Sequence, residues 1–113
     1  MLSLLLGSCQ QSSTDKQSAI NSISVQEVHA IQKTSNSPYT IIDVRTPDEF
    51  ADGHINKALN IDVKSDQFAD EVKKLNPSKK YILYCRSGKR SSKAYGIMTN
   101  LKFENLHNME GGY

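Results

Sequence analysis

The chain has 113 residues, a length that suits one small domain and excludes two. Hydrophobic residues make up 37% of it and the formal net charge is +2, which argues against a chain that is disordered throughout. The sequence pI is near 8.5 and the lysines are scattered, so the basic stripe of a nucleic-acid-binding protein is absent.

Residues that commonly bind metals or form disulfides are few. Cys9 and Cys85 are the two cysteines, so a disulfide framework is excluded. The three histidines, His29, His54 and His107, lie far apart and show no ligand spacing. We therefore predict no metal site and no other cofactor.

The segment 1–9 resembles the end of a bacterial lipoprotein signal peptide. Leucines lead to Gly7 and Ser8, two small residues that precede Cys9. This pattern predicts a lipid on the thiol of Cys9, which would be the only membrane attachment of a periplasm-facing protein of the cell envelope. The alternative is a frayed tail on a cytosolic protein, because no Lys or Arg precedes the short apolar run. No stretch reaches the ~20 apolar residues of a membrane-spanning helix.

Two boundaries follow from composition and capping. Residues 10–22 have no apolar period and are expected to form a flexible tether. The domain is predicted over 23–113, beginning where Ser24 and Glu27 form a capping box for a helix that Pro38 and the residues before it break.

The next elements favour a buried strand followed by a short helix. Tyr39–Arg45 is an apolar run interrupted by Asp43, which suits a strand buried on both faces. Thr46–Glu49 is a second capping box, and its helix is expected to end at Gly53. A short strand is predicted over Ala58–Ile61.

Strands and helices continue to alternate towards the end of the chain. We predict a helix over Ser65–Leu75, a strand over Tyr81–Tyr84, a helix whose apolar face includes Ala94 and Met98, and a strand over Asn105–Met109. Alternation of this kind predicts an α/β fold with a mainly parallel central sheet and helices on both faces.

Binding sites in such sheets lie beyond the carboxyl ends of the strands, so Arg45 and Cys85 are expected to face one crevice. Cys85 follows a strand and precedes a helix, whose free N–H groups favour negative charge. Arg86, Lys89 and Arg90 add positive charge nearby. Such surroundings lower a cysteine pKa from about 8.5 to roughly 3.5–7.5, so we predict an ionised, partly exposed nucleophile.

Three groups of residues resemble the rhodanese family of sulfurtransferases. They are Ile42-Asp43-Val44-Arg45 with Glu49-Phe50, Gly53-His54-Ile55 and Ala58-Leu59-Asn60-Ile61; Tyr84-Cys85-Arg86-Ser87-Gly88-Lys89-Arg90-Ser91; and Phe103-Glu104-Asn105-Leu106 with Met109-Glu110-Gly111-Gly112. The match covers residues 24–113, and its motifs have the family's order and spacing.

The resemblance implies a thiosulfate sulfurtransferase with Cys85 as the catalytic residue and carrier of a persulfide. The substrate would be bound by Arg86, Ser87, Gly88, Lys89 and Arg90. The donor would be thiosulfate or another sulfane-sulfur compound. The acceptor would be a small thiol, a thioredoxin-like protein or cyanide. No metal or organic cofactor is implied.

Two other functions are compatible with a cysteine at the end of a strand: a tyrosine phosphatase and a binding module without turnover. Four residues separate Cys85 from Arg90, whereas tyrosine phosphatases have five in a wider loop, so the shorter loop favours sulfur over phosphate. The remaining alternative is a rhodanese-like module that binds sulfur or a partner protein without turnover.

Supporting roles are predicted for Asp43, Arg45 and Ser91. The two charged residues suit an ion pair or cap that holds the loop, with Glu49 as another possible partner of Arg45, and Ser91 suits the start of a helix. His54 is expected to fix a turn.

The sequence also departs from the family in three places. Lys57 and Lys102 stand where glycines are usual, so left-handed backbone is expected at both. The resemblance also implies a short terminal helix after the double glycine, which a sequence ending at Tyr113 lacks.

Overall fold

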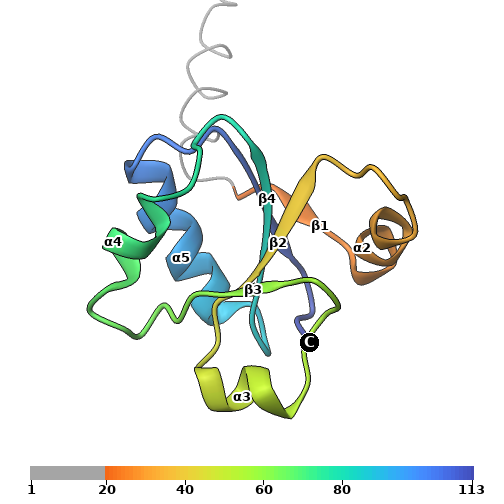
Figure 1. Cartoon of the computed structure of the whole chain (residues 1–113), viewed down its shortest axis with the longest axis horizontal. Helices are drawn as coiled ribbons and strands as arrows, with labels where there is room; N and C mark the ends of the chain where they lie inside the picture. Colours follow the sequence, from red (N-terminus) through yellow and green to blue (C-terminus); the bar gives the residue numbers. More distant parts are fainter. Residues whose placement is uncertain (1–19) are drawn as a thin grey trace, which may run out of the picture.

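The computed structural model describes residues 20–113, drawn in colour in Figure 1. The predicted lipidation site Cys9 and the segment 1–19 lie outside the described residues. Within residues 20–113, no helix combines the length and the apolar character needed to cross a membrane.

Five parallel strands form one sheet in the order β1-β5-β4-β2-β3. Their bounds are Ser22–Ile23 for β1, Tyr39–Asp43 for β2, Leu59–Asn60 for β3, Lys80–Tyr84 for β4 and Asn105–Met109 for β5. The predicted α/β fold with a parallel sheet is confirmed. Strand β4 occupies the centre of the sheet, so the residue that follows it, Cys85, lies at the middle of the carboxyl edge.

Helices cover both faces of the sheet, as predicted. Their bounds are Val25–Gln32 for α2, Pro47–Asp52 for α3, Phe68–Val72 for α4 and Lys89–Asn100 for α5. Helices α4 and α5 lie on one face and α2 on the other, while α3 lies at the carboxyl end of the strands (Figure 1). The site is therefore framed by α3 and by the first turn of α5.

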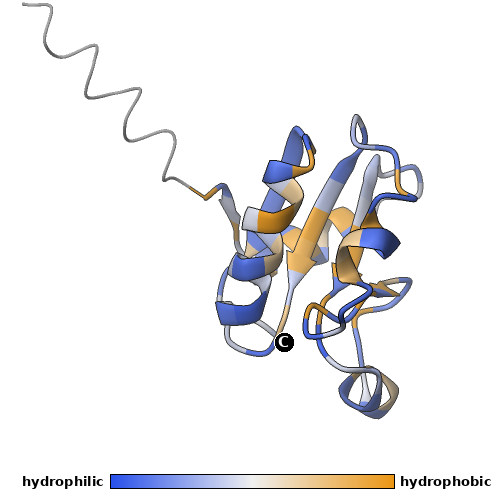
Figure 2. Ribbon diagram, turned by 90° about the vertical axis from the view of Figure 1, so that its left-hand side faces the viewer, coloured by the Kyte–Doolittle hydropathy of each residue, from blue (hydrophilic) through white to orange (hydrophobic). Residues whose placement is uncertain are grey.

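The core consists of two apolar clusters, one on each face of the sheet. Side chains alternate along the central strands, so that Ile42 and Leu83 face α4 and α5, while Ile41 and Ile82 face α2. Figure 2 shows these apolar strands between helices whose outer surfaces are polar. Strand β2 is thus buried on both faces, as its continuous apolar sequence predicts.

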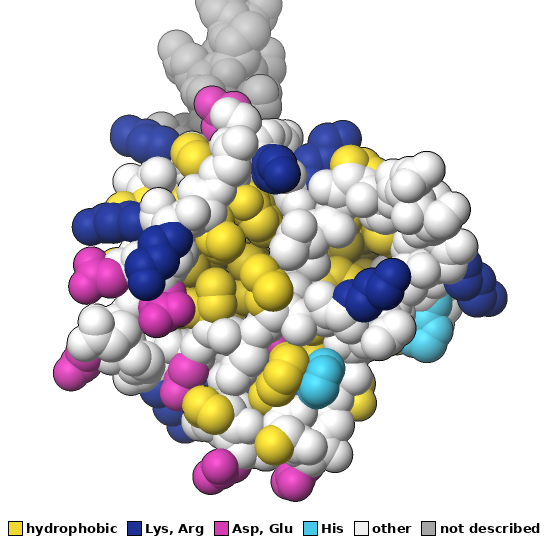
Figure 3. All heavy atoms as spheres, in the orientation of Figure 1, with side chains coloured by type: hydrophobic (Ala, Val, Ile, Leu, Met, Phe, Trp, Pro, Cys, Tyr) yellow, Lys and Arg dark blue, Asp and Glu magenta, His cyan; other side chains and the backbone are white. Residues whose placement is uncertain are grey.

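Charged side chains of both signs are interspersed on the face shown in Figure 3. This distribution agrees with the scattered lysines of the sequence. That face of the molecule has no continuous basic stripe of the kind that follows a nucleic-acid backbone.

Both predicted capping boxes are present. The hydroxyl of Ser24 accepts a hydrogen bond from the N–H of Glu27, and the carboxylate of Glu27 accepts one from the N–H of Ser24. Thr46 and Glu49 form the same reciprocal pair at the start of α3, with Pro47 at its first position. Helix α3 ends at Gly53, as predicted, so its orientation is fixed by local contacts at both ends.

Three elements differ from the sequence predictions. Strand β1 was not predicted, because two residues are too few to show a period. It pairs with β5 through bonds such as that from the N–H of Glu110 to the carbonyl of Ile23, at 2.9 Å. Helix α4 is shorter than the predicted 65–75, and β3 is shorter than the predicted 58–61. The residues that flank α4 form hydrogen-bonded turns, whereas beside β3 the N–H of Ala58 bonds back to Ile55 and that of Ile61 bonds to Asp43.

Lys57 and Lys102 do adopt left-handed backbone, with φ of 68° and 73°. Lys102 follows Leu101, the residue that caps the carboxyl end of α5. The N–H of Lys102 donates to the carbonyl of Thr99 at 3.0 Å, and that of Phe103 to the carbonyl of Met98 at 3.1 Å. These two bonds form a Schellman motif, whose left-handed position glycine usually occupies.

Candidate active site

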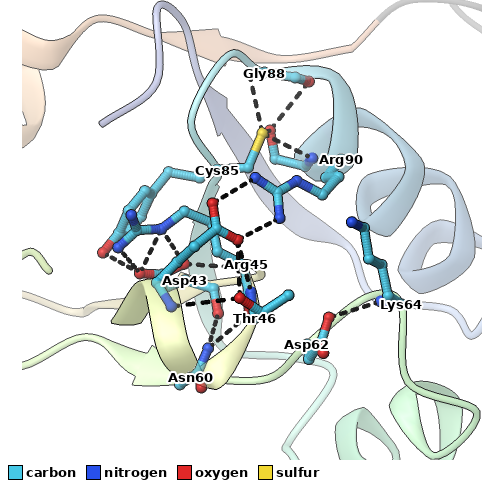
Figure 4. Close-up of polar contacts among 12 residues, drawn as sticks. Asp43, Arg45, Thr46, Asn60, Asp62, Lys64, Cys85, Gly88 and Arg90 are labelled. Carbon is cyan, nitrogen blue, oxygen red and sulfur yellow. Dashed lines mark hydrogen bonds and ion pairs between the residues drawn. The ribbon is translucent and has the colours of Figure 1, made fainter. Parts of the chain in front are cut away.

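The sulfur of Cys85 lies at the amino end of α5, as the sequence predicts. Its Sγ accepts hydrogen bonds from the N–H of Gly88 at 3.0 Å and from the N–H of Ser91 at 3.4 Å. The hydroxyl oxygen of Ser91 lies 3.6 Å from Sγ. Figure 4 shows these contacts around the sulfur. The loop therefore surrounds the thiol with hydrogen-bond donors.

Burial and hydrogen bonding act on this thiol in opposite directions. Burial raises the pKa of Cys85, but the hydroxyl of Ser91 and the N–H groups of Ser91, Gly88 and Ser87 lower it by more. The net pKa is therefore below the ordinary value of a thiol. A thiolate is the form that acts as a nucleophile, so the environment favours the reactive state.

The predicted partial exposure of Cys85 is wrong, because the residue is 0% exposed. It belongs to the apolar cluster on the α5 side of the sheet, where α5 covers the end of β4. The prediction rested on the polar residues of the loop, and those residues do not show that Cys85 packs among the apolar side chains of this cluster.

Gly88 is the turning point of the loop. It has a φ of 96° and immediately precedes α5. Its carbonyl accepts hydrogen bonds from the hydroxyl of Ser91 at 3.2 Å and from the hydroxyl of Ser92 at 2.8 Å. Ser91 is fully buried, and its hydroxyl satisfies this backbone carbonyl at the helix start.

A buried ion pair stands at the end of the neighbouring strand β2. Arg45 contacts Asp43 through two nitrogens, with Nη2 to Oδ2 at 2.7 Å and Nε to Oδ1 at 2.9 Å. The same Oδ2 accepts a bond from the hydroxyl of Tyr84 at 2.7 Å, and Arg45 also donates to the carbonyl of Gly53 at 2.7 Å. The pair thus connects β2, β4 and the end of α3.

The hypothesis that Glu49 pairs with Arg45 is wrong. Arg45 is instead paired with Asp43, which lies only two residues before it in the chain. Glu49 instead binds Arg90 of α5 through two bonds of 2.7 Å and 3.0 Å. The hydrogen bond from Arg90 is the main reason why the pKa of Glu49 lies well below its ordinary value.

A cavity of about 280 Å³ opens at this carboxyl edge. Its lining consists of Arg45, Glu49, Asp52, Gly53, Arg86 and Tyr113. Arg45 faces this cavity, as predicted, and the loop residue Arg86 lies beside it, but Cys85 is not part of the lining. Ser87 and Lys89, also predicted to bind substrate, are exposed on the loop.

The last residues of the chain lie against the cysteine loop, a contact that the sequence analysis missed. The N–H of Tyr113 donates to the carbonyl of Cys85 at 2.8 Å, and the Tyr113 ring lies 4.7 Å from the guanidinium carbon of Arg45. A Cβ atom on Gly112 would lie 1.9 Å from the carbonyl oxygen of Arg86. The double glycine of the sequence was the available signal for this close approach.

His54 has the structural role that the sequence suggests. Its Nδ1 lies 2.8 Å from the carbonyl oxygen of Phe50, and the two rings stack with centroids 3.6 Å apart. These contacts fix the turn after α3. Over residues 20–113, no three His, Cys, Asp or Glu side chains gather as a metal-ligand set.

A thiol held by N–H groups at the end of the central strand of a parallel sheet defines an α/β domain built around a nucleophilic cysteine. The profile described as "Rhodanese-like domain" matches residues 24–113. The chain belongs to this family of rhodanese-like domains.

Relatives and a solved structure agree with this assignment. The chain is similar to Thiosulfate sulfurtransferase 18 of Arabidopsis thaliana, with 32% identity over 90% of this chain and 82% of the relative. It is also similar to Rhodanese-like domain-containing protein 17 of the same plant, with 31% identity over 77% of this chain and 64% of that protein. A rhodanese-related protein from Thermoplasma volcanium has a similar structure, with a TM-score of 0.70 and 32% identity over 81% of this chain and 85% of that one.

Proposed function

We propose that this protein is a thiosulfate sulfurtransferase that carries sulfur as a persulfide on Cys85. The observation that carries the proposal is the Sγ of Cys85, which accepts two N–H hydrogen bonds at the amino end of α5 and has a lowered pKa. The relative named Thiosulfate sulfurtransferase 18 supports the same reaction class.

The reaction is a covalent transfer in two steps. The Cys85 thiolate attacks the sulfane sulfur of thiosulfate, an S–S bond forms, and sulfite leaves with the electrons of the broken S–S bond. A thiolate acceptor then attacks the outer sulfur, and Cys85 leaves as a thiolate. The N–H groups of Gly88 and Ser91 hold the negative charge on Sγ before the first step and after the second.

Partners follow from this chemistry. The donor is thiosulfate or another sulfane-sulfur compound, and the acceptor is a small thiol or the exposed thiol of a thioredoxin-like protein. We also propose that a lipid on Cys9 anchors the protein at the cell envelope, facing the periplasm, which is supported by the motif Leu6-Gly7-Ser8-Cys9.

The first prediction concerns Cys85→Ser, with Cys9→Ser as its matched control. After thiosulfate treatment, mass spectrometry should find one added sulfur atom in the wild-type protein and in Cys9→Ser, and none in Cys85→Ser. Transfer to cyanide should be lost by at least about 10³-fold in Cys85→Ser, because a hydroxyl does not replace the thiolate nucleophile.

Two outcomes would contradict these proposals. Full transfer to cyanide by Cys85→Ser would end the catalytic assignment. For the anchor, Cys9→Ser should leave the membrane fraction of expressing bacteria, and unchanged fractionation would rule the lipid out.

A second candidate function is a rhodanese-like module that binds sulfur or a partner without turnover. The complete burial of Cys85 is the observation that favours it. Absent turnover with thiosulfate, combined with a Cys85 thiol that still titrates at low pH, would select this function over the enzyme.

A further inference from the structure

The cavity at the carboxyl edge stops short of the reactive sulfur. Its lining includes Glu49 and Arg86 but not Cys85, which is 0% exposed. A substrate in the cavity therefore reaches Sγ only after part of the wall has moved.

The ion pair between Glu49 and Arg90 stands between the cavity and the sulfur. Glu49 lines the cavity, and Arg90 lies beside Cys85 (Figure 4). The pKa of Arg90 is raised chiefly by its hydrogen bond to Glu49, and the charge of Cys85 contributes further. Arg90 thus faces two anionic groups at once. The two side chains of the pair are 23% and 26% exposed, so water screens part of their attraction.

Most of the positive charge around the cavity is already neutralised. Asp43 binds Arg45, and Glu49 binds Arg90. Asp52 adds a carboxylate to the lining, while Arg86 forms no ion pair with any residue in 20–113. An anion that enters the cavity therefore meets one arginine without an ion-pair partner, Arg86, although the loop sequence suggests several free cations.

We propose that Glu49 determines which sulfur donors the site accepts, by competing with anionic substrates for Arg90. The inference rests on the proposed role of Cys85 as the nucleophile. A dianion such as thiosulfate has to displace the Glu49 carboxylate from Arg90, whereas an uncharged donor does not.

Among sulfane-sulfur donors, competition by Glu49 favours an organic persulfide of low charge over thiosulfate. In its reaction the Cys85 thiolate attacks the outer sulfur of R–S–SH. A new S–S bond forms to Sγ, the old S–S bond breaks, and R–S⁻ leaves with its electrons. No oxidant or reductant is needed.

The second prediction tests this inference with Glu49→Gln. Glutamine serves equally at the third position of a capping box, so α3 keeps its cap while the charge is lost. Asp48→Asn is the matched control, because it removes one exposed charge from the first turn of the same helix without touching Arg90.

The measurement is the rate at which iodoacetate and iodoacetamide alkylate Cys85. One reagent is an anion and the other is neutral, and each loses iodide to the thiolate. Mass spectrometry of the peptide that contains Cys85 follows the reaction, and Cys9 in the same protein is the internal reference.

Glu49→Gln should raise the ratio of the iodoacetate rate to the iodoacetamide rate roughly two- to fivefold, since the carboxylate that competes for Arg90 in a partly exposed ion pair is removed. Asp48→Asn should leave the ratio unchanged. An unchanged ratio in Glu49→Gln, or equal acceleration of both reagents, overturns the proposal. The assay needs no sulfur transfer, so its failure is distinguishable from failure of the proposed function. If transfer is present, the KM for thiosulfate should fall by a similar factor in Glu49→Gln, with kcat little changed.

Discussion

At the scale of single residues, Ser91 has an unusual amount of influence on the sulfur. Its N–H donates to Sγ of Cys85, and its hydroxyl lies within reach of both Sγ and the carbonyl of Gly88, so the single hydroxyl proton serves either the thiolate or that carbonyl. The neighbouring Ser92 makes the bond to Gly88 without reaching the sulfur. Two adjacent serines therefore share a structural contact, and only one of them acts on the thiol.

The third prediction uses this difference. Ser91→Ala should raise the pKa of Cys85, because one of the groups that outweigh burial is removed. The midpoint of the pH–rate profile for alkylation of Cys85 should therefore move to higher pH. Each of Ser91→Ala and Ser92→Ala removes a hydroxyl that bonds Gly88, at a cost of about 1 kcal/mol in unfolding free energy. Coincident pH profiles for the two variants would show that the hydroxyl of Ser91 does not act on the sulfur.

The sequence predicted the location of Cys85, the direction of its pKa shift and part of the cause, the N–H groups at the helix start. Local order along the chain shows that a strand, a turn and a helix follow one another, which places the thiol below N–H groups. It does not show that Arg90 is bound by Glu49, because those residues are 41 positions apart in the chain. Of the two causes that the sequence suggested, N–H groups at the helix start and nearby cations, the hydrogen bonds lower the pKa of Cys85.

At the scale of elements, the end of α5 needs left-handed backbone at a position that glycine does not occupy. The Schellman motif places Lys102 in the left-handed region, where a side chain costs roughly 1–2 kcal/mol. Glycine loses more entropy on folding and offsets part of the gain.

The fourth prediction is that Lys102→Gly raises the free energy of unfolding by up to about 1 kcal/mol. Lys57→Gly should act in the same direction, because its φ is 68°. Lys93→Gly, in the middle of α5, is the control and should lower the free energy by about 1 kcal/mol. Urea unfolding at constant m-value measures all three, and destabilisation by Lys102→Gly would contradict the strain argument.

Elements with local signals were predicted well, and those that depend on tertiary contacts were not. The helices α2 and α3 begin at their predicted caps, because a capping box is complete within four residues. Strand β1 has two residues and exists only through its pairing with β5, so its sequence carries no period. Helix α4 was predicted too long, since its apolar spacing continues into turns.

At the scale of the whole molecule, residues distant in the chain meet at the cysteine loop. Gly112 contacts the backbone of Cys85 and Arg86 so closely that a Cβ atom would overlap their carbonyl groups. Gly111 has a similar positive φ, of 86°, but no atom lies within 4 Å of its Cβ position. Both glycines therefore need a backbone with positive φ, but only Gly112 lies so close to other atoms that a side chain would overlap them.

The fifth prediction compares Gly112→Ala with Gly111→Ala. Both should lose roughly 1–2 kcal/mol of stability from the left-handed backbone. Gly112→Ala should lose about 1–3 kcal/mol more, because the methyl group forces the loop and the end of the chain apart. Thermal or urea unfolding measures the difference, and equal losses would mean that the terminal residues do not hold the loop.

The fold class could be predicted from the alternation of strand and helix patterns, but the strand order could not. Alternation requires crossovers, and crossovers give parallel strands. Which strands are neighbours depends on how the helices distribute over the two faces, and that is decided by the packing of residues such as Val28 and Met98.

The two sides of the buried sulfur differ in how firmly they are held. On one side is β4, the central strand, with buried residues from Tyr81 to Tyr84. Towards the cavity, Arg90 is bound by Glu49 of α3, a helix of six residues with no buried side chain. Segments with few buried contacts open locally at much lower free energy than the core. We therefore expect Cys85 to be reached through brief unfolding of α3 while β4 stays folded, so that the frequency of this local opening limits how fast the sulfur can react.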